Sequence, residues 1–184
     1  PTSGVFLNMV TKSGSDQWKG RATVAWLGDA TQTQNIDNNL LKYGFRPETN
    51  SVDFVSDANF SIGGPVIARK LRMFGSFRDW RVHVNVPAAF STLVLDNTDI
   101  TSGLMNANYQ INNNNRLTGL YARQYYKKPH RFLTASNVTV LESTNNEDDV
   151  FDIYQGLWNS VVTQKFFIDA RFGLNKIFFP TYLN

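Results

Sequence analysis

The chain has 184 residues, of which 42% are hydrophobic, 14% aromatic and 18% charged, with a net charge of +3 and no cysteine. The length permits one ordinary domain, and the aromatic content favours β-strands. The lack of cysteine excludes a disulfide framework, a thiolate metal site and a cysteine nucleophile. Scattered Lys and Arg, without a basic helix or RNA-binding signature, indicate no nucleic-acid partner. No apolar run approaches the roughly 20 residues that a membrane helix needs, so any bilayer contact is expected through strands.

The first long strand is predicted at residues 18–27, where the residue types alternate strictly. One set of positions carries Trp18, Gly20, Ala22, Val24 and Trp26, and the other carries Lys19, Arg21, Thr23, Ala25 and Leu27. Successive strand side chains point to opposite faces, so the two sets occupy different faces. Tryptophans at both ends are typical of the aromatic girdles of membrane barrels. The polar stretch that follows, 28–57, is predicted to be a loop.

Residues 59–80 predict two strands joined by a hairpin turn at 68–70. In each strand apolar and polar residues alternate, although Phe74 breaks the pattern. The Gly63-Gly64-Pro65 sequence is expected to bend the chain or end a ladder. Because the apolar parity shifts by one before Val82, a β-bulge is predicted at Asp79 and Trp80. Residues 81–102 are predicted to form a second loop, although Val82, Val84 and Val86 also permit an extension of the strand before Pro87.

The remaining strands are predicted at 105–112, 117–126, 150–162 and 166–178. Tight turns are expected at 113–115 and 163–165, and a third polar loop at 127–149. The alternation does not assign the faces of 117–126 or of 150–162. The last residues, Tyr182-Leu183-Asn184, are expected to begin a further loop.

Long and short connections therefore alternate along the chain, and this pattern decides the predicted fold class. Outer-membrane barrels combine short periplasmic turns with long external loops, and a soluble sandwich has no reason to do so. Strands left unpaired at an edge are not tolerated in lipid, so closure is expected. The sequence predicts an all-β fold, an antiparallel up-and-down transmembrane β-barrel segment of about seven strands.

Three stretches carry a resemblance to a known family. They are GVFLNMVTKSGSDQWKG at 4–20, FSIGGPVIARKLRMFGSF at 60–77 and YQGLWNSVVTQKFFIDARFG at 154–173. In this order they resemble the plug-to-barrel junction and early barrel of TonB-dependent outer-membrane transporters, in the subgroup with a carboxypeptidase-regulatory-like N-terminal domain. The resemblance implies a barrel of about 22 strands around a plug, opened for nutrient uptake when the TonB complex pulls on an N-terminal box.

The resemblance divides the chain into the end of the plug and its junction at 1–15, with a last plug strand at 5–11, and a partial barrel at 16–184. It implies location in the bacterial outer membrane, contact with outer-membrane lipid, and coupling to the TonB complex through a part of the parent protein that this sequence does not include. We therefore expect an excerpt of a longer protein, or a processed product. Iron chelates, cobalamin, oligosaccharides and peptides all remain open as ligands.

The same interpretation assigns side chains to the two faces of the barrel. Those expected to line the lumen are Arg21, Arg72, Arg78, Asn106, Asn108, Gln110, Asp169 and Arg171. Those expected to meet lipid or its interface are Trp18, Trp26, Phe77, Tyr109 and Phe172. In the external loops Trp80, Phe90 and Phe132 are candidate ligand contacts, because aromatic rings stack on sugars and other planar ligands.

No catalytic or cofactor site is predicted. The two histidines, His83 and His130, lie far apart in the sequence without a carboxylate and nucleophile beside them. The acidic run 147–149 lacks the spacing of a calcium loop and is expected to be a solvated charge run. The alternative to a transporter segment is a soluble all-β module that binds a ligand or mediates adhesion through its loops.

Overall fold

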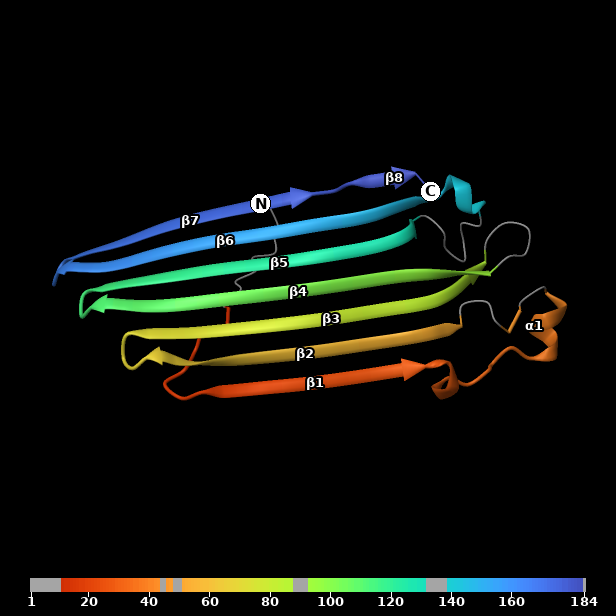
Figure 1. Ribbon diagram of the computed structural model, residues 1–184, viewed down its shortest axis with the longest axis horizontal. Coiled ribbons are helices and arrows are strands. Elements are labelled where there is room, and N and C mark those ends of the chain that lie inside the picture. The colour runs from red at the N-terminus through yellow and green to blue at the C-terminus, as the bar shows by residue number, and fades with distance from the viewer. Residues whose placement is uncertain (1–10, 44–45, 48–50, 88–92, 132–138, 184) are drawn as a thin grey trace, which may run out of the picture.

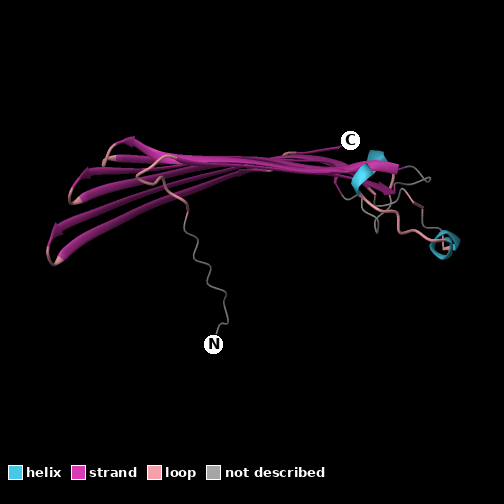
Figure 2. Cartoon of the chain, turned by 90° about the horizontal axis from the view of Figure 1, so that it is seen from below, coloured by secondary structure: helices cyan, strands magenta, loops and turns pink. Residues whose placement is uncertain are grey.

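The computed structural model describes residues 11–43, 46–47, 51–87, 93–131 and 139–183. These residues form one antiparallel sheet with the strand order β1-β2-β3-β4-β5-β6-β7, which is the order of the chain (Figure 1). The all-β, up-and-down fold class is thus confirmed. Within the described ranges the sheet is open, with β1 and β7 at its two edges. Seen along its edge, it is a single layer (Figure 2).

The long strands extend over most of the described chain. Their bounds are β1 Lys19–Gly28, β2 Val52–Ile67, β3 Leu71–Pro87, β4 Leu93–Asn112, β5 Asn115–Arg131, β6 Asn145–Thr163 and β7 Phe166–Phe178. A short strand, β8 Thr181–Leu183, pairs with the first residues of β6. The expectation of a loop at residues 182–184 was therefore wrong for Tyr182 and Leu183. Phe179 and Pro180 separate β7 from β8, and proline lacks the N–H that a ladder requires.

Three tight turns join strands at one end of the sheet, which we call the turn end. They lie at 68–70, 113–114 and 164–165, as predicted to within a residue. Arg69 adopts a positive φ of 60° in the first of them, a conformation that tight turns often require. The opposite end, called the loop end, carries the remaining connections, including η1 Asp29–Thr31, α1 Asn38–Lys42 and η3 Leu141–Ser143 (Figure 1). Asp37 begins α1 by accepting hydrogen bonds from the backbone N–H groups of Asn39 and Leu40.

The predicted loops were drawn too long, although longer and shorter connections still alternate along the chain. β3 continues to Pro87 and β4 begins at Leu93, so most of the predicted loop 81–102 is strand. Likewise β2 begins at Val52, β5 ends at Arg131 and β6 begins at Asn145. Polar residues in these extensions made strands look like loops by composition.

The bulge predicted at Asp79 and Trp80 is also absent. Pairing continues without a shift through Asp79 to Ala58 and Thr101, and through Trp80 to Asp57 and Ile100. The parity change in the sequence therefore leaves the backbone regular. It moves the apolar residues of β3 from one face of the sheet to the other.

Within the described residues, no helix is both long and apolar enough to span a membrane. Val86 is the one hydrophobic residue there that is fully buried, packed against Val84, Val94 and Leu141 near the loop end. A single-layer sheet has no second layer to cover its faces. Large apolar side chains consequently remain exposed across it.

Candidate functional site

The two faces of the sheet differ in chemistry. One face, called the belt face, carries a band of exposed apolar side chains toward the turn end. This apolar belt includes Trp18, Val24, Trp26, Phe60, Ile62, Phe77, Met105, Tyr109, Leu117, Tyr154, Trp158, Phe166, Phe172 and Leu174. On interior strands Phe60, Phe77 and Met105 are 50%, 50% and 53% exposed, so even there no side chain covers the belt.

The other face, called the polar face, carries every residue predicted to line a lumen. Register pairing aligns Arg21, Arg72, Arg78, Asn106, Asn108, Gln110, Asp169 and Arg171 on this one side. Of the predicted lipid-facing residues, Trp26, Phe77, Tyr109 and Phe172 lie on the belt face. Trp18 precedes β1, and its ring covers the belt side of Gly64. The pairing also resolves β5, in which Leu117 and Tyr121 share the belt face while Leu120 and Ala122 share the polar face.

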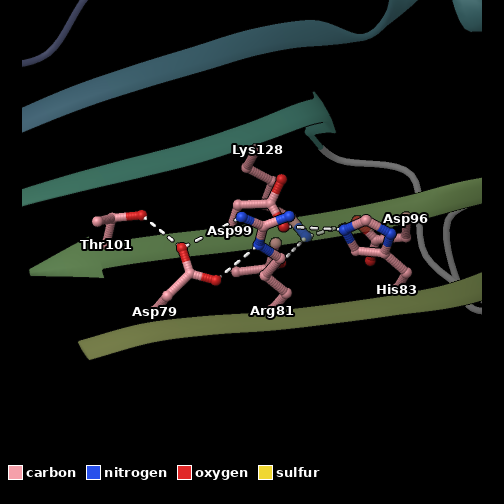
Figure 3. Close-up of polar contacts among 8 residues, drawn as sticks. Asp79, Arg81, His83, Asp96, Asp99, Thr101 and Lys128 are labelled. Atoms are coloured by element: carbon pink, nitrogen blue, oxygen red, sulfur yellow. Dashed lines mark hydrogen bonds and ion pairs between the residues drawn. The ribbon is translucent and has the colours of Figure 1, made fainter. Parts of the chain in front are cut away.

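Toward the loop end the two faces exchange character. On the belt face β3 continues from Phe77 into Asp79, Arg81 and His83, and Figure 3 shows their polar contacts. Asp79 accepts from Arg81 Nε at 2.7 Å and from Thr101 Oγ1 at 3.0 Å. On the polar face the same strand continues into Trp80, Val82, Val84 and Val86. The belt therefore ends partway along the strands, and charged side chains follow it on the same face.

Further hydrogen bonds between polar side chains connect neighbouring strands beyond the belt. On the belt face His83 Nε2 lies 2.8 Å from Asp99 Oδ1, and the His83 ring packs on Phe54 with centroids 4.2 Å apart. Arg123 bridges to Asp152 through two bonds of 2.6 and 2.7 Å. Acids and bases in this zone thus pair with each other across strands, which keeps the outer rim of the sheet polar and close to neutral.

A short segment at the start of the described chain lies across the polar face near the turn end. Asn106 Nδ2 donates to Thr11 Oγ1 at 3.1 Å and to the Lys12 carbonyl at 3.0 Å, and Asn106 is only 3% exposed. Arg72 Nε donates to Asp16 at 2.8 Å. Two predicted polar-face residues therefore hold residues 11–16, of which 11–15 belong to the predicted junction 1–15 and Asp16 begins the predicted barrel part. The predicted plug strand, 5–11, lies outside the described residues except for Thr11.

Gly63 and Gly64 explain how the chain passes the edge of the sheet. A Cβ on Gly63 would lie 3.4 Å from the Gly14 Cα on the polar face, and one on Gly64 would lie 2.4 Å from the Trp18 ring on the belt face. The segment approaches the sheet so closely because Gly64 leaves room for the Trp18 ring and Gly14 leaves room for the Met73 carbonyl, which would lie 2.3 Å from a Cβ at residue 14. The Gly-Gly-Pro sequence thus continues the ladder instead of ending it, and pairing reaches Ile67 and Leu71 after a register shift between Pro65 and Ile67.

The three predicted external-loop contacts do not lie in described loops. Trp80 is not in a loop, because it lies inside β3 on the polar face, paired with Asp57 and Ile100. Phe90 and Phe132 lie outside the described residues. The predicted place of Trp80 in an external loop was wrong, because the loop was expected to begin at residue 81, whereas β3 continues to Pro87.

A shallow hollow of about 470 Å³ lies on the polar face at mid-strand, over β2 to β6. Its lining includes Asn59, Arg78, Ser102, Gln124 and Phe151. None of these except Arg78 was predicted as a site residue. Asn59 begins the predicted strand pair 59–80, Ser102 fell in a predicted loop, and the faces of β5 and β6 were unassigned. Pairing between strands, which a single sequence does not display, brings them together.

No group of three His, Cys, Asp or Glu side chains suited to a metal ion occurs in the described part of the chain. The acidic run 147–149 is not uniformly solvated as expected, because Asp149 is buried and Glu147 pairs with Arg131. His130 Nδ1 lies 3.2 Å from Thr144 Oγ1, far from the His83 pair in the sequence. No family model, curated protein or solved structure matches this chain.

Proposed function

We propose that this chain is a segment of a TonB-dependent outer-membrane transporter, which takes up a nutrient across the bacterial outer membrane using energy delivered by the TonB complex. The membrane part of the proposal rests on the geometry of the apolar belt. The family part rests on the resemblance of residues 4–20, 60–77 and 154–173. In this interpretation the belt face meets lipid and the polar face lines the lumen.

The observation that carries the proposal is the oblique course of the belt across the sheet. Paired positions lead from Ala22, in the middle of the β1 apolar run, through Phe60, Phe77, Gly103, Arg123 and Asp152 to Lys176 on β7. The middle of the β7 apolar run, between Phe166 and Leu174, is Ala170, which lies six residues before Lys176. Six strand-to-strand steps separate β1 from β7, so the belt drifts by one residue per strand.

Such a drift is the signature of tilted strands crossing a flat slab. One residue advances about 3.3 Å along a strand, while neighbouring strands are about 4.8 Å apart, which gives a tilt of roughly 35°. Strands of membrane barrels tilt by about 35 to 45°. A soluble sheet buried against a second layer has no need for an apolar band of this slope.

The position of residues 11–16 supports the transporter interpretation. They lie on the polar face and are held there by Asn106 and Arg72. In a barrel, that side is the lumen, so the part of the chain before β1 would lie inside the barrel as a plug does. The turn end, with its short connections, would face the periplasm.

The four tryptophans allow a direct test, because Trp26 and Trp158 are on the belt face and Trp80 is on the polar face. Three single-tryptophan variants retain Trp26, Trp158 or Trp80 and carry Phe at the other three positions. After reconstitution into vesicles, brominated acyl chains are expected to quench Trp26 and Trp158 strongly and Trp80 weakly. Equal quenching of all three, or recovery of the chain in the aqueous fraction with no quenching, would reject the proposal and favour the soluble module.

A further inference from the structure

The hollow on the polar face gathers several polar groups that the protein does not use. Its amide and hydroxyl side chains, Asn59, Ser76, Ser102 and Gln124, make no side-chain hydrogen bond to any other described residue. Some polar groups nearer the turn end are engaged, since Asn106 holds residues 11 and 12 and Thr118 donates to Asn108 at 2.9 Å. All four free groups are partly buried. The hollow therefore offers donors and acceptors that the protein itself leaves unused.

The hollow carries no uncompensated charge. Arg78 is the charged side chain that points into it from the polar face, and its guanidinium binds both oxygens of Asp57, at 2.9 and 2.7 Å. A bidentate pair of this kind satisfies the fork of the guanidinium and cancels its charge. Arg123 also borders the hollow, but its side chain lies on the belt face, bound to Asp152. An anionic ligand would therefore find no free cation there.

Apolar side chains complete the lining on the side of β4 to β6. Leu104 and Phe151 border the hollow, and the next polar-face row toward the loop end includes Trp80, Ile100 and Tyr126 between Asp57 on β2 and the buried Asp149 on β6. Aromatic rings beside uncharged donors and acceptors suit a ligand that has both hydroxyl groups and flat C–H surfaces. Sugar rings have this chemistry.

We propose that the hollow binds an uncharged oligosaccharide. Asn59, Ser102 and Gln124 would exchange hydrogen bonds with its hydroxyl groups, and Phe151 would pack against a sugar ring. The inference deepens the proposed function, and rests on it, because a site on the polar face would lie along the uptake path and would make the transported nutrient a neutral sugar.

The test uses the full chain with Trp80 as its single tryptophan, since Trp80 lies two residues from Arg78 along β3. Titration is carried out in a detergent without sugar headgroups, because an alkyl maltoside would itself present the probe. The probes are maltotriose and cellotriose, with trigalacturonic acid as a charged trisaccharide of the same size. Saturable binding of a neutral trisaccharide, seen by Trp80 fluorescence and by calorimetry, is expected, with no binding of the acid.

Two variants assign the binding to the hollow. Gln124→Leu is expected to weaken neutral-sugar binding about tenfold, since a buried hydrogen bond is lost. Gln155→Leu changes an exposed residue on the polar face outside the hollow and is expected to leave affinity within about twofold. Absence of saturable binding, tighter binding of the acid, or equal effects of the two variants would overturn the inference. Quenching of tryptophan by lipid tests the proposed function, and sugar binding in detergent tests the hollow. The two measurements are independent, so failure of one proposal can be told from failure of the other.

Discussion

Glycines near the start of the sheet differ in what their surroundings require. Gly14 leaves room for the Met73 carbonyl, which would lie 2.3 Å from its Cβ, and Gly64 leaves room for the Trp18 ring on the belt face. Gly119 lies in a strand on the belt face too, but a Cβ there would meet nothing within 4 Å. The three positions are chemically identical in the sequence, and only their surroundings distinguish a required glycine from a tolerated one.

Substitution at these positions gives a matched comparison. Gly64→Ala forces the Trp18 ring to move and is expected to lower the free energy of unfolding by about 1 to 3 kcal/mol. Gly119→Ala has space for its methyl group and is expected to change it by about 0.5 kcal/mol or less, in the stabilising direction. Denaturant titration of the chain in detergent micelles measures both. Adding Trp18→Ala should reduce the cost of Gly64→Ala, and an undiminished cost would mean that the ring is not the obstacle.

At the scale of single residues, the sequence was informative wherever alternation was clean. All eight residues assigned to a lumen share one face, because period-two patterning follows directly from strand geometry. The hydrogen-bond partners of these residues could not be predicted in the same way. The bonds from Asn106 to Thr11 and Lys12 join positions 95 and 94 residues apart, and no local pattern reports such a contact.

Among the elements, β3 is the most instructive, because its two halves have opposite polarity. Phe77 and Met73 share the belt face with Asp79 and Arg81, while Trp80 and Val82 share the polar face with Arg78. A one-residue bulge and an exchange of chemistry between faces give the same sequence pattern. Only the pairing of β3 with both neighbouring strands distinguishes the bulge from the exchange of chemistry. The sequence therefore predicted that this strand exists but did not predict its length.

Engineered cysteines test the unbroken register, and the chain has no native cysteine to interfere. Val82 pairs with Thr98 on the polar face, and paired positions of antiparallel strands lie within disulfide range. Val82→Cys with Thr98→Cys is expected to form a disulfide on mild oxidation, detected by loss of free thiol. Val82→Cys with Asn97→Cys should remain reduced, because Asn97 lies on the other face. Reversal of this result would restore the bulge at Asp79 and Trp80.

At the scale of the whole molecule, the dominant feature is the exposed apolar belt. The described chain buries one hydrophobic residue while many large apolar side chains stay exposed, so most of the apolar surface has no partner within these residues. The fold class was predictable because strands and turns are local features. The slope of the belt was not, since it depends on the register of every neighbouring pair of strands.

Neighbouring residues of β1 separate the two faces in one experiment. Val24 is 78% exposed on the belt face, whereas Thr23 lies on the polar face. In lipid vesicles Val24→Arg is expected to cost about 2 to 4 kcal/mol of insertion free energy, the cost of arginine near the bilayer centre. Thr23→Arg should cost much less. Resistance of the chain to extraction by alkaline carbonate measures insertion, and equal loss for the two variants would contradict the assignment of the belt to lipid.

The segment pinned across the polar face also constrains the order in which the molecule assembles. The site that binds this segment is formed by Arg72 on β3 and Asn106 on β4, so the site does not exist until those strands have paired. Hairpins between consecutive strands are short-range events, whereas closing this contact means bringing together groups 95 residues apart. Residues 11–16 are therefore expected to bind the sheet late in folding. In a newly synthesised chain they would stay accessible to proteases until half of the sheet has formed.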